Sequence, residues 1–286
     1  MPPRLGGVAD RTLTLMAVHA HPDDEATQTG GVLAKAAAEG IRTVLVTCTD
    51  GSCGDGPGGV KPGEPGHDPA TIVEQRKVEL QKSCDILGID HLELLEYKDS
   101  GMEGWPQNDA PGSFWSTPVE DGASRLAKLI EQYSPDVIVT YDENGFYGHP
   151  DHIQANRITM AAYESSGSKA KVYYGTFPKS KFEEFAAAMK ELGMDDWDEE
   201  LPPGEEGGPP DIGAADEDIT TWVDISDYAE QKYGSLGAHA SQGENIIFLQ
   251  LGLETFTRLM GIETFIRVRD NTNAPLPERD LFDGVR

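Results

Sequence analysis

Two short segments of the chain combine histidines with carboxylates. The first is Ala20-His21-Pro22-Asp23-Asp24-Glu25 and the second is His149-Pro150-Asp151-His152. Imidazole nitrogens and carboxylate oxygens are ligands that a divalent metal such as zinc uses in proteins. Helix capping could explain the aspartates, but it does not explain three histidines beside them. The two segments therefore predict one metal site, built from parts of the chain about 130 residues apart.

The same residues could supply the parts of a metal hydrolase. Such an enzyme needs protein ligands, an open position for water and a base beside that water. His21, Asp24 and His152 form a ligand set of two nitrogens and one carboxylate, which leaves Asp23 as the general base. Spacing alone does not decide which of the two aspartates binds the metal.

Two further groups near the second segment could stabilise charge during the reaction. His149 is expected to act as a charged donor, with Asp151 holding its imidazole in position. Tyr147 is close enough in sequence to offer its phenol to a developing oxyanion. We therefore take Asp23, His149, Tyr147 and Asp151 as candidate catalytic residues.

Both segments lie where an apolar, strand-like run ends and a helical pattern begins. Strands are expected at 13–18, 43–47, 91–96, 136–141 and 171–176, and helices at 26–39, 70–87, 119–133 and from 151 to before 167. This alternation predicts an α/β fold, with a Rossmann-like, mainly parallel sheet and helices on both faces. The usual strand order 3-2-1-4-5 makes the first and fourth strands neighbours, so their loops would converge.

The length of 286 residues allows one large core and an appendage. We expect a catalytic α/β domain over 12–180 and a smaller C-terminal elaboration over 181–286. The elaboration should hold a helix at 181–192, a strand at 219–225 and a helix at 226–239, whose terminal His239 we interpret as structural. The segment 191–218 has twelve acidic residues and no Lys or Arg, which is typical of a solvated loop.

The composition excludes several classes of protein. A formal net charge of -27 argues against binding to nucleic-acid phosphates or an anionic membrane, and it fits a neutral or cationic small substrate. A salt-adapted host is an alternative cause of this charge. We find neither an apolar run near the ~20 residues of a membrane span nor a signal-peptide pattern. Three cysteines without zinc-type spacing indicate reduced thiols, so we expect a cytoplasmic protein and leave homo-oligomerisation open.

Three motifs resemble those of the LmbE-like (PIG-L) N-acetylglucosaminyl deacetylases. They are the segment 20–25, the segment Tyr141-Asp142-Glu143-Asn144-Gly145-Phe146-Tyr147-Gly148-His149-Pro150-Asp151-His152, and His239-Ala240-Ser241-Gln242. Within that family the sequence is most similar to the actinobacterial mycothiol-pathway deacetylases and mycothiol S-conjugate amidases. The likeness covers residues 13–175 well and the rest in patches.

The resemblance implies a Rossmann-like fold and one zinc ion per chain, with Fe²⁺ or Mn²⁺ as alternatives. It implies His21, Asp24 and His152 as metal ligands and Asp23 as the general base. It also implies that His149 and Tyr147 stabilise the tetrahedral intermediate. Two residues outside the motifs, Arg76 and Asp99, match positions that hold sugar hydroxyls.

The function expected from this resemblance is a zinc-dependent amidase that removes an N-acetyl group from an N-acetylglucosamine-containing small molecule. The alternative within the family is a mycothiol S-conjugate amidase. Gln28 counts against this activity, since the amidases carry a lysine at the matching position.

A non-haem iron oxygenase also uses two histidines and one carboxylate, although usually on a β-sandwich. A non-catalytic metal-binding α/β module is the remaining alternative. Dinucleotide binding is excluded because no G-x-G-x-x-G follows the first strand.

Overall fold

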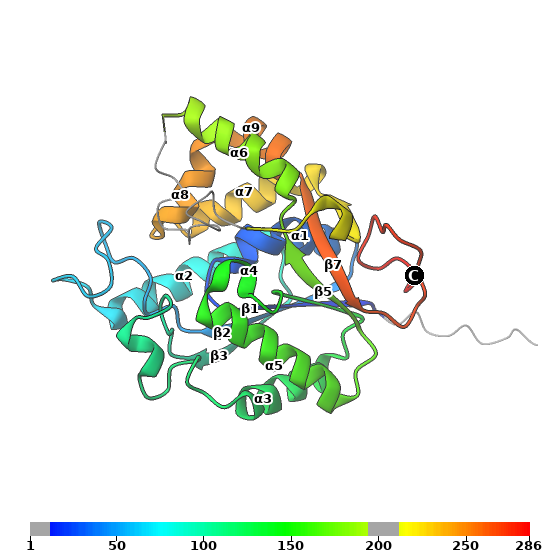
Figure 1. Ribbon diagram of the computed structural model, residues 1–286, viewed down its shortest axis with the longest axis horizontal. Coiled ribbons are helices and arrows are strands. Elements are labelled where there is room, and N and C mark those ends of the chain that lie inside the picture. Colours follow the sequence, from blue (N-terminus) through cyan, green and yellow to red (C-terminus); the bar gives the residue numbers. More distant parts are fainter. Residues whose placement is uncertain (1–11, 194–211) are drawn as a thin grey trace, which may run out of the picture.

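The computed structural model describes residues 12–193 and 212–286 and shows one mixed sheet flanked by helices (Figure 1). The strands are β1 (Thr14–His19), β2 (Arg42–Thr49), β3 (His91–Tyr97), β4 (Val137–Thr140), β5 (Lys171–Thr176), β6 (Thr221–Asp224) and β7 (Ile262–Arg269). The helices are α1 (Gly30–Ala38), α2 (Pro69–Leu87), α3 (Val119–Tyr133), α4 (Gly145–Gly148), α5 (Pro150–Ser166), α6 (Lys179–Glu191), α7 (Ala229–Ala238), α8 (Gly243–Gln250) and α9 (Gly252–Met260). A single π-helical turn, Glu25–Thr29, precedes α1.

The strand order is β3-β2-β1-β4-β5-β7-β6. The strands β1 to β5 are parallel, so the predicted order 3-2-1-4-5 is confirmed. The order reverses between β1 and β4, where loops at the carboxyl ends of the strands leave room for a ligand. The two His-Pro-Asp segments follow these two strands and therefore meet at that point.

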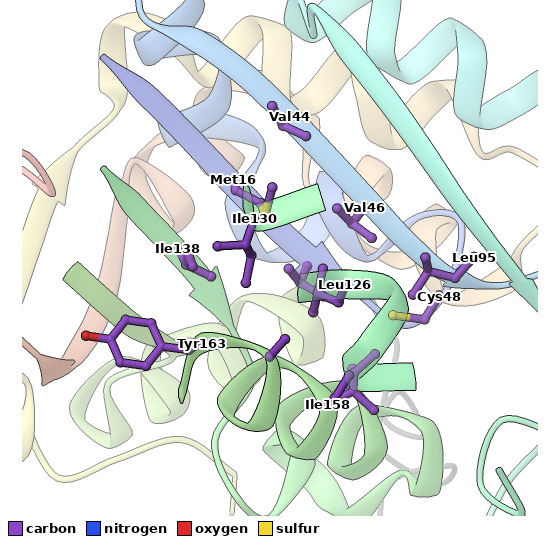
Figure 2. Packing of buried hydrophobic residues seen from close by; sticks show 14 of the residues in the cluster. Met16, Val44, Val46, Cys48, Leu95, Leu126, Ile130, Ile138, Ile158 and Tyr163 are labelled. Carbon is purple, nitrogen blue, oxygen red and sulfur yellow. The ribbon is translucent and has the colours of Figure 1, made fainter. Parts of the chain in front are cut away.

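Apolar clusters on the two faces of the sheet hold the helices in place. On one face, α3 and α5 pack against β1, β2 and β4 through residues such as Met16, Leu126 and Ile158 (Figure 2). On the other face, Leu33 of α1 and Leu80 of α2 belong to a second cluster with Leu15 and Leu45. The central strands β1, β2 and β4 are buried on both sides, which is why they read as continuous apolar runs.

The C-terminal part of the chain extends the same sheet. Strand β7 pairs antiparallel with β5, and β6 pairs antiparallel with β7. Helices α6, α7, α8 and α9 gather at one end of the sheet, around a small third cluster that includes Phe185, Leu236 and Phe256 (Figure 1). The division into a domain at 12–180 and an elaboration at 181–286 stays a prediction, although the elaboration contributes two strands to the common sheet.

The structure also bears on the acidic segment, the cysteines and membrane spans. Most of the acidic segment 191–218 lies outside them, because 194–211 is not described. Cys48, Cys53 and Cys84 are free thiols. Within 12–193 and 212–286, no helix has the length and apolar character that crossing a membrane requires.

Candidate active site

The fold brings His21, Asp24 and His152 together at the carboxyl ends of β1 and β4. The imidazole nitrogens His21 Nδ1 and His152 Nε2 are 3.2 Å apart. The Asp24 carboxylate lies 3.3 Å from His21 Nδ1 and 3.5 Å from His152 Nε2. All three residues are at least nine-tenths buried. Three candidate ligand atoms thus converge on one small volume.

The remaining nitrogen of each of these two histidines contacts an acceptor. His21 Nε2 lies 3.3 Å from Asp151 Oδ2, and His152 Nδ1 lies 3.1 Å from the carbonyl oxygen of Gly145. An acceptor at one ring nitrogen fixes the proton there and leaves a lone pair on the other nitrogen. In the neutral form that can bind a metal, each ring would therefore present its lone pair on the side of the Asp24 carboxylate.

These contacts correct the expected role of Asp151. Its carboxylate was expected to hold His149, but it contacts His21 instead. The backbone N–H of Asp151 is the group that faces His149, donating to Nδ1 at 3.1 Å. This contact occurs because His149 is the N-cap of α5, where the first free amides need an acceptor.

The contact at Nδ1 also changes the expected chemistry of His149. An accepting Nδ1 leaves the proton of the neutral ring on Nε2. Burial, and then the neighbouring His21 charge, hold the pKa of His149 well below its usual value. The accepting Nδ1 and the lowered pKa thus favour a neutral His149 over the charged donor that the sequence indicated.

Tyr141 orients Asp24 and is a residue that the sequence analysis missed. Its buried hydroxyl donates to Asp24 Oδ2 at 2.6 Å and accepts from the N–H of Ala20 at 2.8 Å. Its ring stacks on His152, with centroids 4.1 Å apart and planes at 15°. The N–H of His21 also donates to Asp24 Oδ2, at 2.7 Å. The position of this carboxylate is thus set by two hydrogen bonds.

Asp23 lies in a different environment from Asp24, although the two residues are adjacent. Its backbone has φ 128°, a conformation that is costly for a residue with a side chain. The N–H of Asp23 donates to Glu25 Oε2 at 3.0 Å, and Asp23 Oδ1 lies 3.1 Å from Arg76 Nη2. Burial raises the pKa of Asp23, and the Arg76 charge opposes this shift.

A buried cluster behind Asp23 holds Glu25. Glu25 Oε1 lies 2.7 Å from His239 Nε2 and accepts a hydrogen bond from Ser83. Burial would lower the pKa of His239, but the Glu25 charge raises it above its usual value. The contacts suggest what the structural role of His239 is. His239 holds the Glu25 carboxylate, and Glu25 in turn fixes the backbone of Asp23.

Arg76 and Asp99 stay predicted sugar contacts, and in the structure both are engaged with protein. Besides Asp23, the Arg76 guanidinium donates to the carbonyls of Gly51 and Pro22 at 2.9 and 2.6 Å. The Asp99 carboxylate accepts from the N–H groups of Cys53 and Gly101 at 3.2 and 2.8 Å.

Tyr147 lies beside the histidines on a sharply bent segment. Its ring centroid is 5.1 Å from that of His152 and 6.0 Å from that of His149. The preceding Phe146 has φ 67°, and its N–H donates to Asp142 Oδ1 at 2.8 Å. Asp142 thereby stabilises the turn that presents Tyr147.

The donor set fits a divalent metal of the zinc type. Ligands at zinc bond lengths in a tetrahedral arrangement are separated by about 3.3 Å, close to the separations among His21, Asp24 and His152. Two other groups, His21 with His149 and His152, and His21 with Asp99 and Asp151, have ligand atoms within 4.8 Å of one another. We favour His21, Asp24 and His152, because their atoms are 3.2–3.5 Å apart and the second ring nitrogen of each histidine already has an acceptor.

A cavity of about 470 Å³ opens onto these residues. Asp23, Asp24, Tyr147 and His152 line one part of it, together with Thr27 and Gln28. A substrate in this cavity would therefore meet the candidate metal ligands and the candidate base at the same time.

Comparison with known proteins identifies the family of this chain. The family model described as PIG-L, GlcNAc-PI de-N-acetylase, matches residues 16–163. The 1D-myo-inositol 2-acetamido-2-deoxy-alpha-D-glucopyranoside deacetylase of Nocardiopsis dassonvillei is 41% identical over 94% of this chain and 100% of its own length. The enzyme of the same name from Thermobifida fusca is 40% identical over 82% of this chain and 84% of its own.

A solved structure shows the same fold. The N,N'-diacetylchitobiose deacetylase from Pyrococcus horikoshii superposes with a TM-score of 0.57, at 19% identity over 89% of this chain and 83% of that one. The family match covers both His-Pro-Asp segments, and the two relatives align over 82% and 94% of the chain. The chain therefore belongs to the PIG-L family and is an N-deacetylase, an enzyme that hydrolyses the N-acetyl amide of an N-acetylglucosamine-containing small molecule.

Proposed function

We propose that this deacetylase removes the acetyl group from N-acetylglucosaminyl-inositol with the help of one zinc ion per chain. This substrate is the one named for two relatives that are 40% and 41% identical to this chain. The single observation that carries the metal assignment is the convergence of His21 Nδ1, His152 Nε2 and the Asp24 carboxylate at 3.2–3.5 Å.

His21, Asp24 and His152 would hold the metal. Asp151 and Gly145 would keep the two imidazoles in the required tautomers, and Tyr141 would keep Asp24 in place. A zinc ion bound there supplies polarisation of the amide carbonyl and a lowered pKa for water.

Asp23 would act as the general base. Its buried carboxylate lines the cavity and has a raised pKa, which brings it nearer to the range useful for accepting a proton at neutral pH. Arg76 limits that rise and keeps Asp23 oriented. The proton that Asp23 accepts is then available to the departing amine.

His149 and Tyr147 would stabilise the oxyanion. His149 supplies Nε2–H in its neutral form, and Tyr147 supplies a phenol from the cavity wall. Hydrogen-bond donors fixed before the reaction stabilise developing charge without reorganisation, and one such donor is worth about 10²–10³ in kcat.

A direct assay tests this proposal. The purified enzyme, treated with a chelator and reloaded with Zn²⁺, Fe²⁺ or Mn²⁺, is given N-acetylglucosaminyl-inositol, and the free amine is quantified. We expect activity to disappear with the metal and to return best with zinc. Failure to release amine with any of the three metals would refute the proposed substrate.

The same assay separates the two branches of the family. Gln28 lies in the cavity wall, where a neutral side chain suits an N-acetyl substrate. We expect the wild type to prefer the N-acetyl substrate over a mycothiol S-conjugate. A preference for the S-conjugate that Gln28→Lys leaves unchanged would place the enzyme with the amidases.

A further inference from the structure

The segment that leads from the candidate metal ligands into α1 is held at both ends by the C-terminal part of the chain. It consists of the π-helical turn Glu25–Thr29 and the first turn of α1. Helix α7 packs against both (Figure 1). At one end His239, just after α7, contacts Glu25. At the other end lies Lys232, about two turns earlier in α7 and therefore on the same side of it.

A carboxylate from a distant strand caps the start of α1. The N–H groups of Gly31 and Val32 are the ones that an N-cap side chain normally satisfies. Thr29 stands at the N-cap position, but its side chain makes no capping bond and lies 2.8 Å from His19 Nε2 instead. Glu263 of β7 takes its place, and its two carboxylate oxygens accept the two N–H groups, each at 2.8 Å.

A buried ion pair and two glycines complete this contact. Lys232 Nζ lies 2.6 Å from Glu263 Oε1, and both residues are at least 95% buried. A Cβ at Gly30 would lie 3.1 Å from Lys232 Cγ, and a Cβ at Gly31 would lie 2.5 Å from Ile225 Cγ1. The two glycines therefore allow the C-terminal part of the chain to approach the start of α1 closely.

Gln28 is the cavity residue nearest in sequence to this contact. It precedes α1 by two positions, belongs to the π-helical turn and lines the cavity. Its side chain is half-buried, and within 12–193 and 212–286 its amide has no hydrogen-bond partner. The amide is therefore available to a ligand, and its place in the cavity wall depends on the backbone that carries it.

We propose that Glu263, held by Lys232, is a positioning residue that fixes Gln28 in the cavity wall and so determines how tightly the substrate binds. The contact of Glu263 with Lys232 and with the start of α1 is here called the α1 anchor. The inference rests on the proposed function, in which Gln28 meets the N-acetyl substrate. Both residues of the ion pair lie outside the residues 16–163 that match the family, so the C-terminal part would help to build the substrate site.

The α1 anchor predicts a specific kinetic change. The catalytic end of the segment has supports of its own, since Tyr141 holds Asp24 and Glu25 holds the N–H of Asp23. Loss of the anchor should therefore leave kcat and zinc affinity close to wild type. It should raise KM by about two- to tenfold, which is the net worth of about one hydrogen bond.

Two matched pairs of substitutions test this expectation. Lys232→Met/Glu263→Gln removes both buried charges together and takes away one of the two oxygens that cap α1. The control is Lys171→Met/Glu278→Gln, a second buried ion pair, in which Lys171 begins β5 at the opposite end of the strands from the site. We expect the first protein to have the raised KM for N-acetylglucosaminyl-inositol and the control to have the KM of wild type.

A double-mutant cycle with Gln28→Ala shows whether Glu263 acts through Gln28. Glu263 also lines the cavity, so a direct contact with the substrate would raise KM whether or not Gln28 is present. We expect Lys232→Met/Glu263→Gln to add no further rise in the Gln28→Ala protein, because effects that pass through one group are not additive. An equal rise in both backgrounds, or no rise in either, would overturn the proposal.

Hydrogen exchange keeps this inference separate from the proposed function. In chelator-treated protein without substrate, the amides of residues 28–32 should exchange faster in Lys232→Met/Glu263→Gln than in wild type, and the control should match wild type. Unchanged exchange would overturn the α1 anchor. If wild type releases no amine from N-acetylglucosaminyl-inositol, the proposed substrate is refuted, and the same KM comparison with the methyl glycoside of N-acetylglucosamine decides the role of Glu263.

Discussion

At the scale of single residues, two adjacent aspartates have opposite surroundings. Asp24 accepts hydrogen bonds from Tyr141 and His21, and although burial opposes it, the imidazole charge of His152 holds the pKa of Asp24 well below its usual value. Asp23 has a raised pKa and a neighbouring guanidinium. Asp24 therefore suits a metal ligand and Asp23 a base.

This difference predicts unlike effects of the same substitution. Asp23→Asn should keep the metal and lower kcat by about 10²–10⁴, the usual contribution of a general base. Asp24→Asn should lose the metal, because it removes the one anionic ligand. Metal content by atomic spectroscopy together with kcat decides the assignment. Loss of metal in Asp23→Asn with retention in Asp24→Asn would mean that the two roles are exchanged.

Tyr141 provides a second prediction. Tyr141→Phe keeps the ring that stacks on His152 and removes only the hydroxyl that positions Asp24. Loss of such a supporting contact should weaken metal affinity by about 10–100-fold. The matched control is Tyr133→Phe, which removes a hydroxyl bonded to Glu93, away from the site. Equal metal affinity in both variants would show that Tyr141 does not orient the ligand.

Sequence reasoning placed His21, Asp24 and His152 correctly in space but missed Tyr141. Tyr141 comes at the end of an apolar run, where a tyrosine is typical of a buried strand, and only the fold shows its hydroxyl to be 2.6 Å from Asp24. The partner of Asp151 was unpredictable for a similar reason. Neighbours in sequence suggested His149, whereas the geometry of the start of α5 turns the carboxylate towards His21.

At the scale of elements, the five parallel strands were predicted from the sequence, whereas the C-terminal strand β7 was missed. The bounds expected for α3 and β5 agree with the structure, because an amphipathic period marks α3 and the Val-Tyr-Tyr segment marks β5. Strand β7 follows directly after α9 and pairs antiparallel with β5, a long-range choice that local pattern does not specify. Its Ile-Glu-Thr-Phe-Ile-Arg-Val-Arg sequence was nevertheless a usable signal.

The contact between the end of α7 and the π-helical turn Glu25–Thr29 leads to a prediction about stability and kcat. His239 follows α7, and through Glu25 it supports the strained backbone of Asp23. His239→Ala leaves a buried carboxylate with a lost partner, which should cost about 1–3 kcal/mol of stability. It should also lower kcat while leaving KM and metal content nearly unchanged, since neither the ligands nor the cavity wall is altered.

The conservative variant separates support from catalysis. His239→Gln keeps a hydrogen-bond donor for Glu25 and should recover most of kcat. Thermal unfolding, metal content and steady-state kinetics of the two variants provide the comparison. If His239→Gln were as slow as His239→Ala at equal stability, His239 would act in the reaction itself and not through Glu25.

At the scale of the whole molecule, the metal site connects distant parts of the chain. His21 and Asp24 follow β1, and His152 lies in the first turn of α5 after β4, 131 positions beyond His21 in the sequence. A ligand that binds only the folded state stabilises it, by about 2.7 kcal/mol at a hundredfold excess over Kd. The unfolded chain cannot bring these residues together, so metal binding should contribute to the stability of the entire sheet.

Thermal unfolding with and without metal tests this linkage. Chelator-treated protein should have a lower Tm, and added zinc should raise it in a concentration-dependent way. His152→Ala should abolish the rise, whereas His91→Ala, at an exposed histidine at the start of β3, should retain it. An equal zinc-dependent shift in His152→Ala would place the stabilising ion elsewhere on this acidic chain. The net charge of -27 attracts cations to the whole surface. Comparing His152→Ala with His91→Ala distinguishes a specific metal site from that general attraction.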